Sequence, residues 1–162
     1  MPETTAAALH EIVERFHGAM LKKSADDLAD LYAVDARHEF PFLFPGLPAC
    51  FNGREEIRAG YGAMWGATPV EPETIRDVVI HEAAEAGTVV VEQTVVGALA
   101  PTGRPVTVPG ILVIRVRDGL IVHTRDYMDG LGVAKATDRL PDLVAALGGQ
   151  PAAPARSPVT AP

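Results

Sequence analysis

The spacing of apolar side chains changes once along this chain, and that change restricts the fold more than any other feature. Up to Trp65 apolar residues recur at helical spacing, whereas from Thr74 to Met128 they alternate with polar residues. The alternating part predicts strands over residues 75–82, 88–98, 105–117 and 119–128. Because Glu85-Ala86-Gly87, Pro101-Thr102-Gly103 and Asp118-Gly119 are short turn sequences, these strands should pair as an antiparallel meander.

Three helices are expected to precede this meander. The second begins after Ser24, a typical N-cap residue, and should run through Leu28, Leu31 and Tyr32. A short strand over 37–40 and a proline-interrupted hydrophobic loop over 41–48 separate it from the third helix. The apolar stripes of the first and third helices are Leu9, Ile12, Val13, Phe16 and Met20, and Ile57, Tyr61, Met64 and Trp65.

A bend in the sheet would make a pocket. Pro109-Gly110 interrupts a predicted strand and should produce a bulge or bend that curls the sheet. A curled sheet with helices across its concave face encloses a cavity. We therefore expect an α+β fold in which about three N-terminal helices wrap a cone-shaped, curved antiparallel sheet. With 162 residues, 48% of them hydrophobic, the chain should form a single domain over residues 1–147, followed by a disordered Pro/Ala-rich tail over 148–162.

Charge and cysteine content exclude several classes of partner and site. A formal net charge of −7 lacks the positive surface that nucleic acids and anionic membranes require. Cys50 is the only cysteine, so neither an intrachain disulfide nor a cysteine-rich zinc site can form. The sequence has no histidine-pair spacing for a metal, no glycine-rich phosphate loop and no apolar segment long enough to span a membrane. We therefore expect a cytoplasmic protein that binds no metal, cofactor, nucleic acid or membrane.

The last predicted strand places a carboxylate among apolar neighbours, because alternation puts Asp126 on the more apolar face of the strand. That face carries Leu120, Val122, Thr124, Asp126 and Met128. Removal from water disfavours the charged form of a carboxylate and suits it to proton transfer near neutral pH. Asp126 is therefore the predicted catalytic group. The alternative is a structural aspartate that pairs with an arginine such as Arg125 or accepts backbone hydrogen bonds.

Four short motifs carry a resemblance to a known family: Glu39-Phe40-Pro41-Phe42, Pro45-Gly46-Leu47-Pro48, Gly53-Arg54 and Arg125-Asp126-Tyr127. Together with the order of expected elements over about residues 5–138, they resemble the nuclear transport factor 2-like superfamily, and within it the SnoaL-like group. The resemblance implies a single SnoaL-like domain with a cystatin-like α+β barrel fold, an internal pocket and a homodimer. It also implies an isomerase, polyketide cyclase, epoxide hydrolase, dehydratase or simple binding module.

The catalytic pattern of ketosteroid isomerase is absent from this chain. Its oxyanion-binding tyrosine falls on Phe16, its base on Phe40, and its second acid near Leu112. That enzyme's machinery is therefore not expected here.

The pattern of limonene epoxide hydrolase is present in part. It matches Pro101-Thr102-Gly103-Arg104 and Asp126, but its arginine and second aspartate fall on Gln93 and Val95. In the SnoaL-like cyclases a single acidic group serves as both acid and base, which is compatible with Asp126 acting alone.

Two further polar residues are expected at the pocket. Alternation on the strand over 88–98 places Gln93 on the inner face, where it binds a substrate carbonyl or hydroxyl, orients Asp126, or pairs with a neighbouring strand. The resemblance places His38 toward the pocket, where it would exchange protons with Asp126. The alternative for His38 is a half-buried strand histidine that is bonded to the backbone.

The apolar lining follows from the position of the pocket in the superfamily, between the helices and the sheet. The predicted substrate-binding residues are Phe16, Met20, Phe40, Tyr61, Trp65, Gln93, Val95, Leu112 and Met128, with Phe42 and Phe44 at the mouth. Such a pocket favours an apolar cyclic ligand with one or two oxygens.

The sequence therefore predicts a cofactor-independent enzyme in which Asp126 and His38 perform acid/base chemistry of the cyclase or isomerase type. Its substrate would be a small, apolar, oxygenated molecule, and the enzyme would act as a homodimer. The alternatives are a non-catalytic dimeric module that binds a small molecule, and an epoxide hydrolase.

Overall fold

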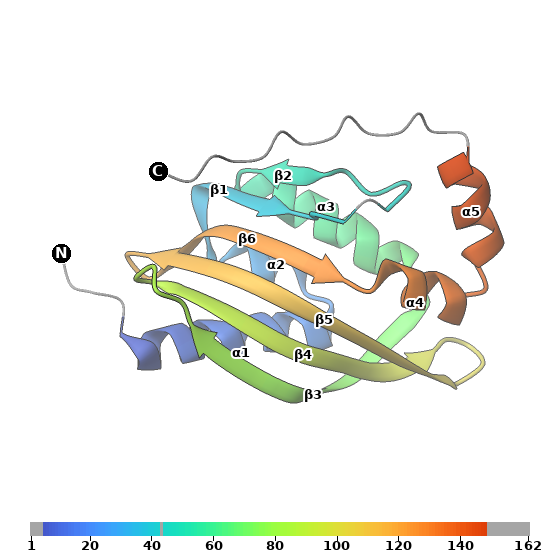
Figure 1. Ribbon diagram of the computed structural model, residues 1–162, viewed down its shortest axis with the longest axis horizontal. Helices are drawn as coiled ribbons and strands as arrows, with labels where there is room; N and C mark the ends of the chain where they lie inside the picture. Colours follow the sequence, from blue (N-terminus) through green and yellow to red (C-terminus); the bar gives the residue numbers. More distant parts are fainter. Residues whose placement is uncertain (1–4, 43, 149–162) are drawn as a thin grey trace.

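The computed structural model describes residues 5–42 and 44–148, and these contain five helices and six strands (Figure 1). In chain order the elements are α1 (Ala6–Lys22), α2 (Ala25–Ala29), β1 (Tyr32–Glu39), β2 (Cys50–Asn52), α3 (Arg54–Ala67), β3 (Val70–Glu82), β4 (Thr88–Leu99), β5 (Arg104–Arg117), β6 (Leu120–Met128), α4 (Gly130–Ala136) and α5 (Leu140–Gly148).

One sheet of six strands organises the chain, in the order β2-β1-β6-β5-β4-β3. It is curved and unclosed, with β2 and β3 at its two edges. Neighbouring strands are antiparallel except β1 and β6, which run parallel. The expected α+β fold with a curved meander is confirmed, and the parallel pair is a feature that the prediction of an antiparallel sheet did not include.

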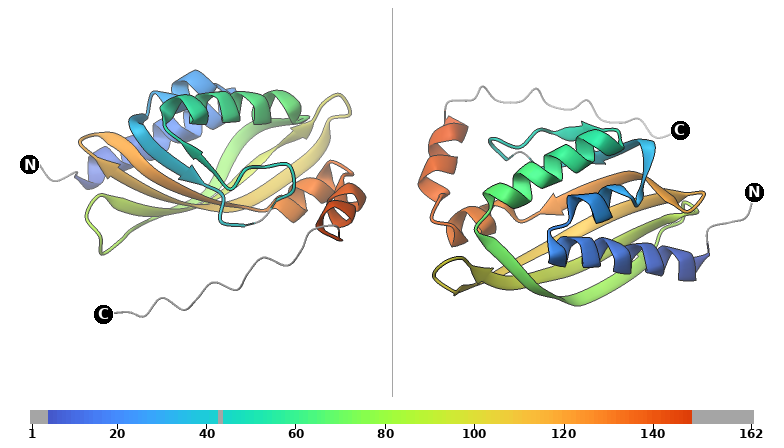
Figure 2. Two further views of the ribbon diagram at one scale, coloured as in Figure 1. Left: turned by 90° about the horizontal axis from the view of Figure 1, so that it is seen from above. Right: turned by 180° about the vertical axis from the view of Figure 1, so that it is seen from behind.

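The helices fall into two groups (Figure 2). α1, α2 and α3 lie across one face of the sheet, whereas α4 and α5 follow the end of β6 at one end of the sheet. Over residues 5–42 and 44–148, no helix has the length and hydropathy needed to span a membrane. The core fills the space between the first group and the inner face of the sheet. Its most buried members include Phe16, Leu28, Ile57, Val91, Ile114 and Ile121.

The second helix is shorter than predicted. α2 ends at Ala29, and Tyr32 is the first residue of β1 instead of the last turn of the helix. Leu31 and Tyr32 are consecutive and both almost completely buried, at 2% and 0% exposure. Tyr32 was assigned to the helix from its spacing to Leu28, but tertiary contacts of its hydroxyl group favour the strand.

Three elements were not predicted: β2, α4 and α5. Signals for the two helices are present in the sequence, because Asp129 caps α4 by accepting a hydrogen bond from the Gly132 amide at 2.8 Å, and Pro141 stands in the first turn of α5. Gly148 belongs to α5 and not to the predicted tail. The rest of that predicted tail, residues 149–162, lies outside the described residues.

Pro109-Gly110 does not form a bulge, one of the two predicted features, because β4 and β5 pair without a register shift through these residues. A register shift does occur between β5 and β6, where Val122 is the extra residue. This bulge breaks the alternation along β6, so that Ile121 and Thr124 are both completely buried. Leu120 and Val122 therefore do not continue the inner face that carries Thr124 and Asp126.

Candidate functional site

A chain of hydrogen bonds joins four buried side chains to Asp126. Tyr32 Oη lies 2.9 Å from Thr124 Oγ1 and 2.8 Å from His38 Nδ1. The other ring nitrogen of His38, Nε2, lies 2.9 Å from Tyr61 Oη, and Tyr61 donates to Asp126 Oδ2 at 3.2 Å. Tyr32, His38 and Thr124 are completely buried, whereas the Asp126 side chain is 18% exposed. The carboxylate is therefore the accessible end of an otherwise buried polar chain.

Strand pairing brings these residues together. His38 of β1 is directly opposite Thr124 of the parallel strand β6, and Asp126 lies two residues further along the same face. Tyr61 of α3 lies within hydrogen-bond distance of both His38 and Asp126. The direct distance from His38 Nε2 to Asp126 Oδ2 is 3.8 Å, which is too long for a hydrogen bond. Tyr61 is therefore the link between the imidazole and the carboxylate.

The hydroxyl proton of Tyr61 sets the direction of this chain. When Tyr61 donates to Asp126, its oxygen must accept from His38 Nε2. For a neutral imidazole this assigns the hydrogen to Nε2 and leaves Nδ1 to accept from Tyr32. Tyr32 then accepts from Thr124. Every donor points toward Asp126, and such a series of aligned bonds strengthens the last donor in it.

Asp126 opens into a cavity of ≈ 650 Å³ between the helices and the inner face of the sheet. Of the residues predicted to bind substrate, the cavity is lined by Met20, Tyr61, Trp65, Gln93, Val95 and Met128. A volume of this size suits a small organic molecule. The structure thus brings most of the predicted lining residues to one place, together with Asp126.

Four of the predicted site residues do not line this cavity. Phe16, Phe40 and Leu112 are 1%, 5% and 1% exposed and pack in the hydrophobic core. His38 also lies behind the wall, with its ring 5.1 Å from the ring of Tyr61. His38 can therefore act on a ligand only through Tyr61.

One end of the cavity is formed in part by two helices that sequence reasoning left out. Residues of α4, of α5 and of the turn between them line this end together with the segment Phe44–Leu47 of the predicted hydrophobic loop. Arg139 of that turn and Asp142 of α5 are among them, so the lining is less uniformly apolar than expected. Of the two residues predicted at the mouth of the pocket, Phe44 lines the cavity. Phe42 does not: it is 64% exposed and packs on Tyr127, with the ring centroids 5.4 Å apart.

Gln93 stands on the inner wall and makes two contacts with α1. Its Oε1 lies 2.7 Å from His17 Nε2, and its Nε2 lies 3.9 Å from Met20 Sδ. The amide is 7% exposed. Burial lowers the pKa of His17, although the hydrogen bond with Gln93 and the charge of Glu14 oppose that change. Gln93 is therefore a buried amide that also reaches a cavity.

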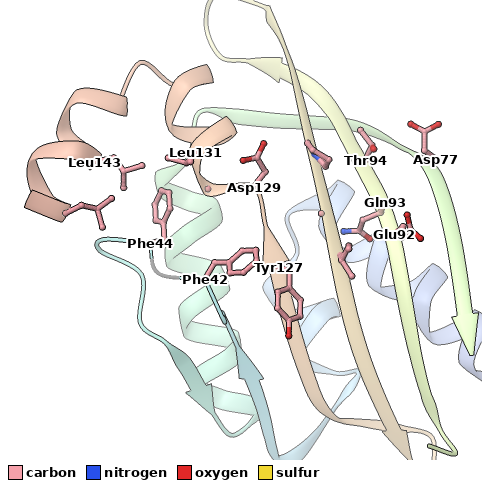
Figure 3. A pocket seen from close by; sticks show the side chains of 15 residues that line it. Phe42, Phe44, Asp77, Glu92, Gln93, Thr94, Tyr127, Asp129, Leu131 and Leu143 are labelled. Atoms are coloured by element: carbon pink, nitrogen blue, oxygen red, sulfur yellow. The ribbon is translucent and has the colours of Figure 1, made fainter. Parts of the chain in front are cut away.

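A second hollow of ≈ 760 Å³ lies on the outer side of the sheet (Figure 3). Phe42 and Tyr127 lie side by side there, and the acidic side chains Asp77, Glu92 and Asp129 line it as well. Asp126 lines the inner cavity, and the polar chain ends there. We therefore regard the inner cavity as the candidate site, although it is the smaller of the two.

The site includes residues that sequence reasoning missed. Tyr32 and Thr124 of the polar chain, and His17 beside Gln93, were not predicted as site residues. Thr124 was placed on the correct face of its strand, so its strand position was a usable signal. Tyr32 and His17 carried no such signal, because their partners lie far away in the sequence.

Two tyrosines of the site are held in their protonated form. Burial, the neighbouring Asp126 charge and the hydrogen bond to Asp126 raise the pKa of Tyr61 well above its ordinary value of 10.0. Burial also raises the pKa of Tyr32. The pKa of each tyrosine is higher in the folded protein than in the unfolded chain, so deprotonation favours unfolding. The stability that the two protonated hydroxyl groups provide is therefore fully present below pH 10 and is lost as the pH rises further.

An alkaline titration tests this arrangement. In a Tyr127→Phe variant only Tyr32 and Tyr61 remain of the three tyrosines. We expect their phenolate absorbance to appear only together with the loss of secondary structure, recorded in the same sample by circular dichroism. Phenolate that forms while the protein is still folded would show that these hydroxyl groups are not the buried donors described above.

Among residues 5–42 and 44–148, no three His, Cys, Asp or Glu side chains are grouped to hold a metal ion.

Comparisons with known proteins match this fold. The family model of the SnoaL-like domain matches residues 13–124. YesE, an uncharacterised protein of Bacillus subtilis (strain 168), is 29% identical over 127 residues, which cover 78% of this chain and 84% of YesE.

Solved structures give the same result. A protein from Bacillus subtilis, described only provisionally as an isomerase, has a TM-score of 0.74 and 27% identity over 82% of this chain and 94% of its own. A Catenulispora acidiphila protein with a ketosteroid isomerase-like fold has a TM-score of 0.63 and 23% identity, over 79% of this chain and 92% of its own. A Xanthomonas campestris protein, described provisionally as a polyketide cyclase, has a TM-score of 0.59 and 23% identity, over 75% of this chain and 90% of its own.

Proposed function

This chain belongs to the SnoaL-like family, and we propose that it is a cofactor-independent enzyme that uses Asp126 for acid/base chemistry on a small, apolar, oxygenated molecule. The reaction is of the cyclase or isomerase type. The observation that carries the proposal is the position of Asp126, whose carboxylate lines the cavity while Tyr61 donates a hydrogen bond to it.

The chemistry follows from this position. A carboxylate that is fixed by a hydrogen bond and faces a ligand can remove a proton from it and return the proton elsewhere. Tyr61 and His38 hold the carboxylate in place, because the hydrogen bonds from His38 to Tyr61 and from Tyr61 to Asp126 end on its Oδ2 atom. Apolar residues such as Trp65 and Val95 make burial of an apolar ligand favourable. The provisional descriptions of two related structures, isomerase and polyketide cyclase, are compatible with this class of reaction.

Substrate screening tests the proposal. The protein is incubated with cyclic ketones, poly-β-keto esters and epoxides, and mass spectrometry records both retention on the protein and conversion. In parallel, incubation in heavy water shows whether the protein exchanges carbon-bound hydrogen of each ketone. Conversion or exchange that disappears in the Asp126→Asn variant is the expected result.

The screen also separates this function from the two alternatives. A ligand that stays bound and is recovered unchanged from both proteins would indicate a binding module instead. Labelled water oxygen in a diol product would indicate an epoxide hydrolase. That reaction is less compatible with the cavity, because Gln93 and Val95 stand where the relay of the epoxide hydrolase pattern has an arginine and an aspartate.

We propose further that the protein is a homodimer that pairs through the outer face of the sheet. Phe42 and Ile111 lie on this face and are 64% and 41% exposed, and α1, α2 and α3 cover only the opposite face. Exposed apolar side chains of this kind on one face are typical of a protein–protein interface.

Substitution at this face is expected to abolish the dimer. Ile111→Glu should reduce the molar mass measured by sedimentation equilibrium from that of two chains to that of one. The matched control is Val34→Glu in the irregular start of β1, where the valine is 75% exposed. A wild-type protein that sediments as a monomer would contradict the proposal.

A further inference from the structure

We propose that Gln93 presents its amide N–H group to the cavity as a hydrogen-bond donor and that His17 holds it in that orientation. A ligand of this cavity must then offer an acceptor oxygen, and a ketone is the substrate class that fits best. This inference rests on the proposed function for the identity of the site, but its test measures binding and not turnover.

The contacts of Gln93 with α1 fix which end of the amide faces which neighbour. Its Oε1 is 2.7 Å from His17 Nε2 and its Nε2 is 3.9 Å from Met20 Sδ. In the opposite orientation the carbonyl oxygen would face the sulfur of Met20, and both of these atoms are acceptors. The observed orientation avoids that contact and gives the oxygen a donor in His17.

His17 can supply this donor in both of its charge states. Its Nε2 carries a hydrogen in the protonated ring and in one neutral tautomer, and Gln93 Oε1 selects that tautomer. Burial lowers the pKa of His17, and the hydrogen bond with Gln93 and the charge of Glu14 oppose that change. His17 takes one lone pair of the Gln93 oxygen on the α1 side, so a ligand in the cavity meets the amide chiefly through its N–H groups.

The amide hydrogens remain available to a ligand. The sulfur of Met20 is a weak acceptor and lies 3.9 Å from Gln93 Nε2. It can accept a weak hydrogen bond from one of the two N–H groups and none from the other. Gln93 is 7% exposed and lines the cavity. A buried donor without a good partner is unfavourable, so a ligand oxygen that accepts from it is bound selectively.

Gln93 and Asp126 thus give the cavity two polar groups of opposite character. Asp126 accepts a proton and Gln93 donates a hydrogen bond, and both line the same space. A ketone with a hydrogen on the adjacent carbon satisfies both. When the C–H bond breaks, the proton goes to Asp126, the bonding pair forms the enolate double bond, and the carbonyl pair moves to the oxygen that Gln93 contacts. A hydrogen bond that strengthens as this charge develops favours the reaction.

The test measures the binding of a decalone probe to the wild-type protein and to Gln93→Met. Dissociation constants come from calorimetry, and the carbonyl environment comes from the infrared stretching frequency of decalone labelled with carbon-13 at the carbonyl. We expect the wild type to bind the ketone about tenfold more tightly than Gln93→Met does and to lower its carbonyl frequency. The lowered frequency should be absent in Gln93→Met.

Two variants of His17 show whether this residue acts by orienting the Gln93 amide or only by filling space beside it. His17→Phe keeps a ring but removes the donor to Gln93, so the carbonyl shift should decrease because the amide is free to turn over. His17→Gln restores a donor and should restore the shift. In the wild type, the side-chain amide NMR signal of Gln93 should also move on addition of decalone, a measurement that does not depend on how well any variant folds.

Several results would overturn this inference. They are equally tight binding of the ketone by Gln93→Met, failure of the ketone to bind, a bound ketone with an unchanged carbonyl frequency, or an unchanged shift in His17→Phe. The proposed function fails separately, if turnover or hydrogen exchange of a substrate persists in Asp126→Asn. A carbonyl shift without any Asp126-dependent reaction would leave Gln93 as the recognition group of a binding protein.

Discussion

Replacement of Asp126 by asparagine should reduce kcat by about 100- to 10,000-fold on any substrate that the wild type converts. Asparagine has nearly the same shape, and its carbonyl oxygen can still accept the hydrogen bond from Tyr61, which Asp126 Oδ2 accepts at 3.2 Å. The amide, however, cannot accept a proton from the substrate. The loss should therefore appear in kcat, while KM and the unfolding midpoint in urea stay close to their wild-type values.

The control for this experiment is the same chemical change outside the cavity. Asp118 lies in the turn between β5 and β6 with a φ of 52°, a backbone conformation that asparagine also tolerates. Asp118→Asn should keep full activity. If Asp126→Asn retained more than about a tenth of the wild-type kcat, general acid/base catalysis by this carboxylate would be ruled out.

Replacement of His38 by leucine should produce the largest loss of stability among the site variants. The imidazole bonds Tyr32 Oη at 2.8 Å and Tyr61 Oη at 2.9 Å, and it is completely buried. Leucine fills a similar volume but leaves two buried hydroxyl groups without this partner, each at a cost of about 1–3 kcal/mol. The free energy of unfolding, measured by urea denaturation, should decrease by at least about 2 kcal/mol.

Two further variants isolate the cause of that loss. His10→Leu changes an exposed histidine of α1 and should leave stability within about 0.5 kcal/mol of the wild type. In the double variant Tyr32→Phe with His38→Leu, one orphaned hydroxyl is removed, so the combined loss should be smaller than the sum of the two single losses. Strictly additive losses would mean that Tyr32 and His38 are not coupled.

Local sequence rules were sufficient for the strands and for the direction of several side chains. Period-two alternation placed Gln93 on the inner face of β4, as the structure does, because β4 pairs with β5 without interruption. The same rule placed Asp126 and Thr124 correctly on β6. It failed for Leu120 and Val122, because a single extra residue in the strand reverses the faces before it.

The polar chain itself could not be predicted, because it depends on contacts between distant segments. Tyr32 and Thr124 are 92 positions apart and meet only because β1 pairs in parallel with β6. Tyr61 was recognised as part of an apolar stripe on a helix, and its spacing is that of a core residue. Only the packed structure shows that its hydroxyl group connects His38 with Asp126.

The origin of the cavity walls has a consequence for how such proteins diversify. Asp126 and its hydrogen-bonded partners lie on β1, α3 and β6, whereas residues near the C-terminal end of the described chain, in α4 and α5, line the opposite end. Mutations in those two helices can therefore change the shape and size of accepted molecules while the proposed proton-transfer groups stay in place. Selection, or a directed-evolution library restricted to residues 130–148, can explore new ligands without first losing the proposed reaction.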